Sequence, residues 1–307
     1  MSKDVSTTEL CRICPRECGV NRNAGDLGFC GAGAEVLVSH YGPHFGEEPP
    51  ISGTNGSGNI FFSPCNLRCV FCQNHQISHN AVGRSVTVER LSVIFLELQD
   101  RGVHNINLVS PTPYIGQIAP AIRMARAKGV KIPLVYNTNA YESSEALALL
   151  EGLIDIYLPD FKYWHESAGR RLSRAPHYPE TAKSALVEMK RQVGDLRINQ
   201  GLARQGLLIR LLVLPGGLAG TKPALRWIKD ILGTQTYISL MSQYYPLHQA
   251  QHYPMLARPI TKQEYDEVVD FAIGQGFQNI FGQDMESAPL FIPDFEKEEP
   301  FGGICEI

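Results

Sequence analysis

Short apolar runs alternate with helical patterns along most of the chain. Each run is only a few residues long and mostly apolar, as expected for parallel strands covered on both faces. The predicted strands are Asn59–Ser63, Ile106–Ser110, Leu134–Asn137, Ile154–Asp160, Leu207–Leu214 and Tyr237–Met241. The helices predicted between them are Val88–Asp100, Ala182–Val193 and Lys222–Leu232. After the last strand, Thr261 and Glu264 form a capping box that predicts a further helix.

Repeated strand–helix units predict a parallel sheet with right-handed crossovers. The six units found are fewer than the eight of a closed α/β barrel. The predicted fold is therefore α/β with an open or partial barrel. A chain of 307 residues fits one such domain.

The first part of the chain shows neither the strand pattern nor the helical pattern. The stretch from Cys11 to about Tyr41 is rich in cysteine and glycine, and Gly42–Gly58 is rich in proline and glycine, which predicts a loop. We therefore expect a cysteine-rich N-terminal segment with a linker in residues 1–57. The partial barrel is expected in residues 58–287 and a C-terminal tail in residues 288–307.

Composition narrows the class of protein. Hydrophobic residues make up 44% and charged residues 19%, which is ordinary for a soluble globular enzyme. The formal net charge of −3, without a long basic run, argues against a nucleic-acid partner. No apolar stretch approaches the roughly 20 residues of a membrane span, and the N-terminus lacks the apolar core of a secretion signal. We expect a cytoplasmic protein without a membrane partner.

Cysteine usage points to metal. Seven of the eight cysteines fall in two motifs, which in a reducing cytosol favours metal binding over disulfides. Cys305 stands apart near the C-terminus and is expected to be an ordinary thiol.

The first motif is a CxxxCxxC loop formed by Cys65, Cys69 and Cys72, directly after the strand Asn59–Ser63. Three thiolates are one fewer than the four that normally hold a [4Fe–4S] cluster. An iron without a protein ligand can bind a substrate or a cofactor. Zinc sites usually show paired CxxC motifs, so this loop favours a catalytic cluster over a zinc loop or a set of buried thiols.

The second motif comprises four cysteines in a short segment: Cys11, Cys14, Cys18 and Cys30. Four thiolates can complete a closed site, either an auxiliary [4Fe–4S] cluster or a tetrahedral zinc. The CxxC start suits both, whereas the three-residue gap before Cys18 is unusual for a zinc knuckle. The spacing favours iron–sulfur by a small margin.

Polar residues follow the predicted strands at their carboxyl ends, where ligands gather in parallel α/β sheets. These candidates are Ser110, Thr112, Asn137, Asn139, Asp160 and Lys162. Asp160 and Lys162 are two residues apart and point the same way, so they pair with each other or hold a cation and a carboxylate. Ser110 and Thr112 alternatively form a proline-stiffened turn, and the asparagines alternatively make local turn contacts.

Two further candidates come from the later strands. Arg210 lies inside an apolar strand, where a charge is costly unless it is paired. Its partner is either a bound carboxylate or a structural Asp or Glu. His248, in a loop rich in tyrosine and proline, either reaches the mouth of the sheet or is a surface or packing residue.

The CxxxCxxC loop, with Phe71 directly before its last cysteine, resembles the radical S-adenosylmethionine (SAM) superfamily. The resemblance implies a (β/α)6 barrel, and an open iron chelated by the amino and carboxylate groups of SAM. It implies that one electron from the cluster cleaves SAM to methionine and a 5′-deoxyadenosyl radical, which abstracts hydrogen from a substrate. Where many members carry Gly-Gly-Glu this chain has Ser110 to Thr112, to whose backbone we assign contact with the SAM amino group. Phe71 and the polar candidates above are the remaining expected SAM contacts.

The order of several motifs along the chain narrows the resemblance to one group within the superfamily. Gln73-Asn74 after the loop, the Asp160–Lys162 pair, the Arg210 strand and the late His248 together resemble the pyruvate formate-lyase activating enzyme-like group. That group implies a glycine on a partner glycyl radical enzyme as substrate, and an electron donor such as flavodoxin or ferredoxin. In this chain the additional cysteines precede the loop, whereas activating enzymes with extra clusters usually carry them after it.

Three functions therefore stay open. The first is hydrogen abstraction from a partner's glycine, and the second is radical modification of a peptide, metabolite or nucleobase. The third is an iron–sulfur electron carrier or scaffold that never cleaves SAM. The polar residues after the third and fourth strands argue against a bare carrier, which needs no SAM pocket.

Overall fold

A computed structural model describes residues 8–285 and 292–301 of the chain. Cys305 and most of the predicted C-terminal tail lie outside the described residues. The strands are β1 (Val36–His44), β2 (Ser57–Phe62), β3 (Arg84–Val86), β4 (Ile106–Val109), β5 (Leu134–Thr138), β6 (Ile156–Pro159), β7 (Arg197–Asn199), β8 (Leu202–Leu212), β9 (Tyr237–Met241) and β10 (Ile280–Gly282). The α-helices are α1 (Pro49–Ser52), α2 (His75–Ser78), α3 (Val88–Asp100), α4 (Ile115–Ala127), α5 (Ser144–Ala148), α6 (Glu166–Ser173), α7 (Tyr178–Val193), α8 (Thr221–Leu232) and α9 (Lys262–Gly274).

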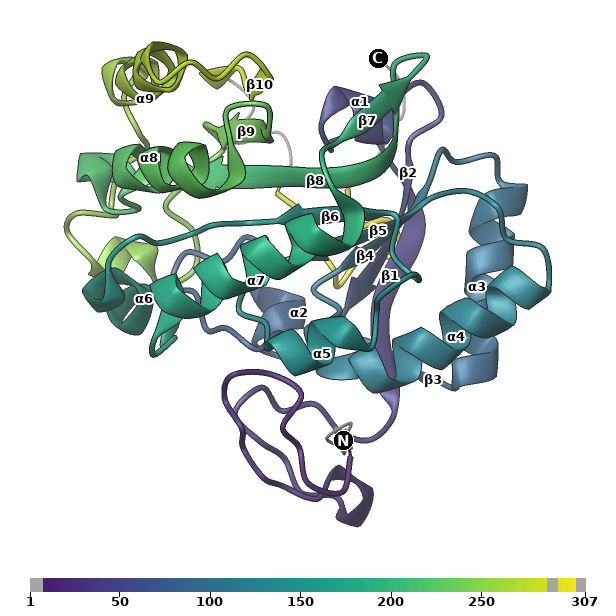
Figure 1. Ribbon diagram of the computed structural model, residues 1–307. Helices are drawn as coiled ribbons and strands as arrows, with labels where there is room; N and C mark the ends of the chain where they lie inside the picture. Colours follow the sequence, from purple (N-terminus) through teal and green to yellow (C-terminus); the bar gives the residue numbers. More distant parts are fainter. Residues whose placement is uncertain (1–7, 286–291, 302–307) are drawn as a thin grey trace.

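One curved sheet carries the fold (Figure 1). Its strands follow the order β10-β9-β8-β6-β5-β4-β2-β1-β3, and β7 pairs with β8. From β2 to β10 every neighbouring pair along this path is parallel. The path ends at β3 and β10, so the sheet is an open, partial barrel. All six predicted strands are present, and the predicted fold class is confirmed.

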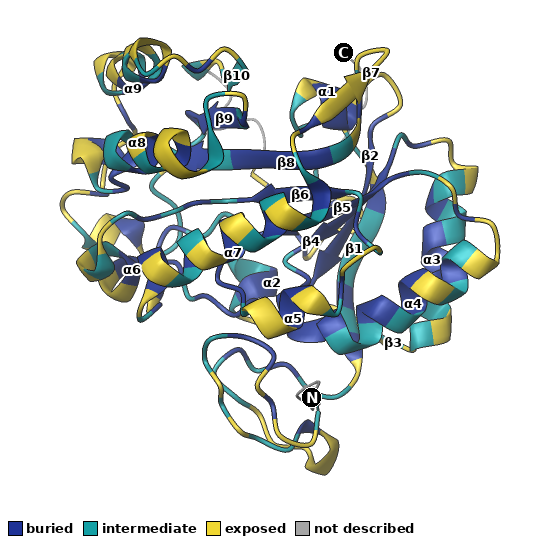
Figure 2. Ribbon diagram, viewed as in Figure 1, coloured by how far each residue is buried: buried dark blue, intermediate teal, exposed yellow. Residues whose placement is uncertain are grey.

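Helices cover the outside of the sheet and bury one face against it (Figure 2). The predicted helix at 88–100 matches α3, whose Leu91, Ile94, Phe95 and Leu98 are buried. The predicted capping box opens α9, with both of its reciprocal hydrogen bonds formed. No helix within the described ranges is long and apolar enough to cross a membrane.

The sheet extends further toward the N-terminus than the predicted barrel. Strand β1 runs antiparallel to β2, and β3 pairs with its other edge. The strand was not recognisable in the sequence because only three of the nine positions of β1 are buried and the strand contains Pro43. The predicted loop at Gly42–Gly58 instead holds the end of β1, the short helix α1 and the start of β2.

The cysteine-rich segment before β1 lies below the barrel in the view of Figure 1. Apart from a 3-10 turn at Arg22–Ala24 it has no helix or strand among its described residues. Backbone hydrogen bonds from Cys11 to Val20 and from Gly19 to Cys11 close it into loops. Ile13 and Ala32 are its buried aliphatic side chains, so the segment has little core of its own.

Candidate active site

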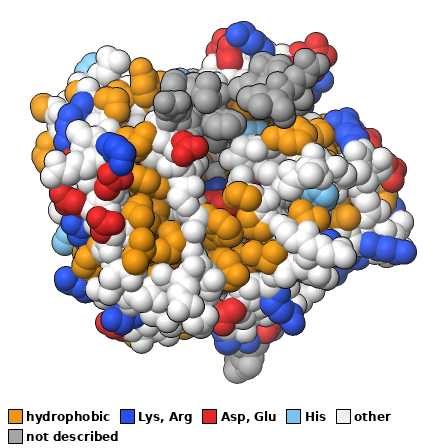
Figure 3. Space-filling model, turned by 90° about the horizontal axis from the view of Figure 1, so that it is seen from above, with side chains coloured by type: hydrophobic (Ala, Val, Ile, Leu, Met, Phe, Trp, Pro, Cys, Tyr) orange, Lys and Arg blue, Asp and Glu red, His pale blue; other side chains and the backbone are white. Residues whose placement is uncertain are grey.

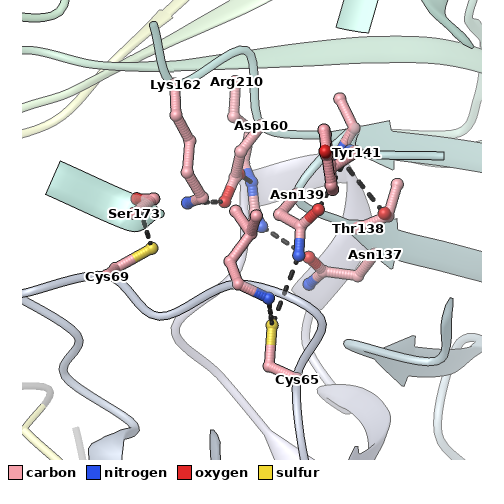
Figure 4. A network of polar contacts seen from close by, with 12 residues as sticks. Cys65, Cys69, Asn137, Thr138, Asn139, Tyr141, Asp160, Lys162, Ser173 and Arg210 are labelled. Atoms are coloured by element: carbon pink, nitrogen blue, oxygen red, sulfur yellow. Dashed lines mark hydrogen bonds and ion pairs between the residues drawn. The ribbon is translucent and has the colours of Figure 1, made fainter. Parts of the chain in front are cut away.

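A cavity of about 220 Å³ lies at the carboxyl ends of the parallel strands. The loop after β2 brings Cys65, Cys69 and Cys72 to its wall. Phe71 of the same loop also lines it, as do predicted residues that follow or lie in the other strands: Ser110, Asn137, Asn139, Asp160, Lys162 and Arg210. The parallel sheet thus joins into one cavity side chains that are far apart in the sequence (Figure 4).

Each of the three cysteines in the CxxxCxxC loop has a neutral hydrogen-bonding group beside its sulfur. The amide of Asn139 donates to Cys65 Sγ over 3.3 Å, and the Ser173 hydroxyl donates to Cys69 Sγ over 2.9 Å. The hydroxyl of Ser78 lies 3.1 Å from Cys72 Sγ. Donors of this kind stabilise thiolates bound to metal and hold them in place.

Burial disfavours free thiolates at these cysteines, and a nearby cation offsets part of that effect at two of them. Burial raises the pKa of Cys65 and Cys69, while the nearby Lys162 ammonium lowers the pKa of both. Burial raises the pKa of Cys72 to about 12. Within residues 8–285 and 292–301 no three His, Cys, Asp or Glu side chains are arranged to hold a single metal ion. Three buried thiols on one cavity wall, with donors to sulfur and a lysine nearby, fit the donor set of a cluster with three cysteine ligands.

Asp160, Lys162 and Arg210 form a buried ionic network on the cavity wall. Asp160 accepts from Lys162 Nζ over 2.7 Å and from Arg210 Nε over 2.6 Å. Burial alone would raise the pKa of Asp160, but the two cations outweigh it and hold the pKa below its usual value. Burial would lower the pKa of Lys162, and Asp160 outweighs this and raises it. All three groups are therefore charged at neutral pH.

Glu47, which the sequence did not single out, completes this network. Its carboxylate lies 3.2 Å from Arg210 Nη1 and also accepts from the side-chain amides of Asn59 and Asn107. Arg210 therefore has structural carboxylate partners, one of the two alternatives that its position in the strand left open. Glu47 follows β1 in a stretch that the sequence predicted to be a loop, so no strand pattern marked it.

Two predicted SAM contacts lie elsewhere. Thr112 is buried, and its hydroxyl donates to Glu142 instead of facing the cavity. His248 lies 3.1 Å from the ring of His79, measured between the nitrogens, and stacks on His75. Neither side chain lines the cavity, and the expected contact of the backbone near Thr112 with SAM stays a prediction, as does that of His248. By contrast Gln243 and Tyr244, from the same loop as His248, do line the cavity.

Glu142 is a buried carboxyl group behind the cavity wall. Its Oε1 accepts hydrogen bonds from Thr112, Tyr136 and Thr138, and its Oε2 has no hydrogen-bond partner among the described residues. Burial raises the pKa of Glu142 to about 7, although these hydroxyl donors lower it. No sequence pattern marked Glu142, because it follows the end of β5 by four positions.

The N-terminal cysteines lie close enough to interact electrostatically, although the described residues include no set of three that is arranged around a single metal ion. Cys11, Cys14 and Cys30 are buried and Cys18 is partly exposed. Gly28 packs so closely on Cys18 that a side chain there would meet its sulfur, which explains the glycine.

Comparisons with known proteins agree with this picture. Residues 59–197 match the family model of the radical SAM superfamily. The chain is 29% identical over 275 residues to the uncharacterized protein MJ0674 of Methanocaldococcus jannaschii, covering 85% of this chain and 74% of that protein.

Solved structures share the fold at low identity. HydG, a maturase of the [FeFe]-hydrogenase, aligns with a TM-score of 0.51 and 13% identity, over 71% of this chain and 49% of its own. Methylornithine synthase (PylB) aligns with a TM-score of 0.50 and 12% identity, over 82% of this chain and 77% of its own. The chain thus spans about half the length of HydG, and both likenesses concern the fold alone. The superfamily implies a [4Fe–4S] cluster and SAM, and the cysteine loop fits that cluster. The match of residues 59–197 to the radical SAM superfamily model, the partial barrel and the CxxxCxxC loop thus agree with one another.

Proposed function

We propose that this chain is a radical SAM enzyme that abstracts a hydrogen atom from its substrate. When bound, the [4Fe–4S] cluster and SAM supply the electron and the 5′-deoxyadenosyl group for that step. Cys65, Cys69 and Cys72 hold the cluster. The observation that carries the proposal is that these three thiols share one cavity with a buried, charged Asp160–Lys162 pair.

The chain's own residues bind and orient the cofactor. Lys162 offers an ammonium for the carboxylate of SAM, and Asp160 keeps that ammonium charged and fixed. The side chains of Asn137 and Asn139 lie on the same wall and suit ribose hydroxyls or a carboxylate. Phe71 is buried beside Tyr163 and Tyr244 and closes the loop against water.

Cleavage of SAM is the first test. The anaerobically reconstituted protein, reduced with dithionite, should release 5′-deoxyadenosine from SAM. Cys69→Ala should abolish that release and lower the iron content, whereas Cys305→Ala should leave both unchanged. Absence of release from the fully loaded wild type would favour an electron carrier or scaffold. Release by Cys69→Ala would refute the ligand assignment.

We further propose that the substrate is a glycine in a partner glycyl radical enzyme. The order of motifs resembling activating enzymes supports this choice. The cavity is lined by Tyr245, which is 37% exposed, and by Phe301. Figure 3 shows hydrophobic side chains around a central hollow with charged side chains inside it. An exposed apolar surface of this kind suits contact with a protein.

Electron paramagnetic resonance tests the substrate. Candidate partner enzymes incubated with the reduced protein and SAM should develop a glycyl radical signal. Replacing the target glycine with alanine should remove the signal while 5′-deoxyadenosine is still formed. Deuterium transfer into 5′-deoxyadenosine from a peptide, metabolite or nucleobase, with no glycyl signal, would instead support radical modification of that substrate.

A further inference from the structure

Two of the four N-terminal cysteines contact a buried arginine. Arg22 is 3% exposed, and its Nη2 lies 3.0 Å from Cys11 Sγ and 3.9 Å from Cys30 Sγ. The backbone N–H groups of Phe29 and Ala32 donate to the sulfurs of Cys18 and Cys30. A single guanidinium and two loop amides therefore converge on three of the four sulfurs.

The charge of Arg22 needs an anion at this place. Its Nη1 donates to the Pro113 carbonyl over 2.6 Å, and among the described residues its Nε is buried without a hydrogen-bond partner. In the part of the chain that the structure describes, it makes no ion pair with a carboxylate. A buried, unpaired guanidinium is costly. Neutral thiols leave this cost in place, whereas thiolates bound to metal, with their net negative charge, remove it.

The cysteine segment is docked on the CxxxCxxC loop. Arg16, between Cys14 and Cys18, donates to the Asn66 carbonyl over 2.9 Å, directly beside Cys65. From the other side Arg68, between Cys65 and Cys69, donates to the Cys30 carbonyl over 2.9 Å. Arg16 also lies over the Phe29 ring, 3.4 Å from its centre. Two reciprocal arginine contacts thus hold the two cysteine sets against each other.

We propose that Cys11, Cys14, Cys18 and Cys30 bind a second [4Fe–4S] cluster, paired with Arg22 and held against the loop of the first. Zinc satisfies the ligand count equally well. The contact between the two cysteine sets favours iron–sulfur. Two neighbouring clusters can exchange electrons, whereas a structural zinc ion does not transfer electrons. The site is independent of the proposed function, because it requires neither SAM cleavage nor a particular substrate.

Metal analysis of a loop variant tests the site apart from catalysis. The triple variant Cys65→Ala, Cys69→Ala, Cys72→Ala should keep about four irons and four sulfides per chain after anaerobic purification. On reduction it should show a [4Fe–4S] signal that SAM does not change. Adding Cys14→Ala and Cys30→Ala to that variant should remove the iron. About one zinc and no sulfide in the triple variant would overturn the proposal, as would a metal-free chain that is folded by circular dichroism.

The role of Arg22 is tested by the midpoint potential of the cluster in the triple variant. Arg22→Gln should shift the potential to more negative values, because a buried cation near the sulfurs stabilises the reduced, more negative cluster. Arg12→Gln removes an exposed arginine from the same segment, and its screened charge should leave the potential unchanged. An unchanged potential in Arg22→Gln, with iron retained, would contradict the pairing of Arg22 with the cluster.

Discussion

At the scale of single residues, Arg210 stands out because it places a full charge inside the barrel. Its guanidinium links Asp160, Glu47 and Asn137, which come from three different parts of the chain. Its side chain is only 13% exposed. Removing one member of such a buried network leaves the other charges without a partner. The stability lost in this way exceeds the stability that the intact network adds relative to apolar residues of similar size.

Arg210→Met should lower the free energy of unfolding by about 3–5 kcal/mol, because Asp160 and Glu47 lose their shared cation. The control is Lys222→Met, which breaks the exposed ion pair between Lys222 and Glu267 and should cost less than about 1 kcal/mol. Denaturant unfolding at matched iron content measures both. Equal losses in the two variants would contradict the buried-network interpretation.

Glu142 should make stability depend on pH. Burial raises its folded pKa to about 7 from a usual value of 4.5, so the unfolded chain loses this proton first. Stability is therefore highest below pH 4.5 for this group and falls as the pH rises through 7. Relative to Glu142→Gln, the wild type should lose about 2 kcal/mol between pH 5 and pH 8.

The control for that prediction is Glu145→Gln, which removes an exposed carboxylate from the first turn of α5. Its unfolding free energy should follow that of the wild type at both pH values. A constant difference between wild type and Glu142→Gln across the range would show that Glu142 is already ionised in the folded protein.

The sequence predicted those site residues whose position follows from a motif or a strand end. The cysteines of the loop and the pair Asp160 and Lys162 belong to this class, and they line the cavity. Glu47 reaches the cavity through an irregular turn, and Ser173 reaches Cys69 from a helix about a hundred residues later in the chain. Such contacts depend on tertiary packing, which local spacing does not encode.

At the scale of elements, β8 shows how one glycine accommodates a crossing segment. Gly206 has a φ of +124°, and a Cβ there would collide with the backbone of Asp195 and Leu196. The strand is therefore able to pass the turn after α7 and still pair with β6. No other residue type fits this position without displacing the neighbouring backbone.

Gly206→Ala should destabilise the protein by about 3 kcal/mol, from backbone strain together with overpacking. Gly274→Ala is the matched control, since Gly274 ends α9 with open space around it. That substitution should stabilise the protein by about 0.5 kcal/mol. Thermal unfolding of both variants measures the two effects. An unchanged stability of Gly206→Ala would show that the neighbouring segment moves aside easily.

Helices and strands were predictable where their burial produces a clear pattern of apolar residues in the sequence. The parallel strands are buried on both faces, so they appear in the sequence as unbroken apolar runs. Helix α4 was not predicted, because Pro120 lies within its apolar pattern. The short strands β7 and β10 are largely exposed and carry no periodic signal.

At the scale of the whole molecule, the N-terminal segment and the barrel share an interface built from arginines. Arg16→Leu removes the hydrogen bond to Asn66 and the contact with Phe29. Amide hydrogen exchange in residues 8–35 should become about tenfold faster, since a charged hydrogen bond of this kind contributes about 1.5 kcal/mol. Exchange in the strands of the barrel should stay as in the wild type.

The exposed Arg12 again provides the control for this measurement, and Arg12→Leu should leave exchange in the segment unchanged. If Arg16→Leu also left it unchanged, other contacts, such as that of Arg68 with the Cys30 carbonyl, would suffice to hold the segment in place.

Strand β1 determines where the protein can be shortened. Because β1 pairs with β2 along Val38 to His44, a truncated chain starting at residue 58 would leave unpaired backbone groups along one border of the sheet. The exposed backbone groups of such a strand can pair with strands of other chains, which leads to aggregation. A truncation that keeps Val36 onward retains this protection, so light scattering should find it monodisperse and the shorter product aggregated.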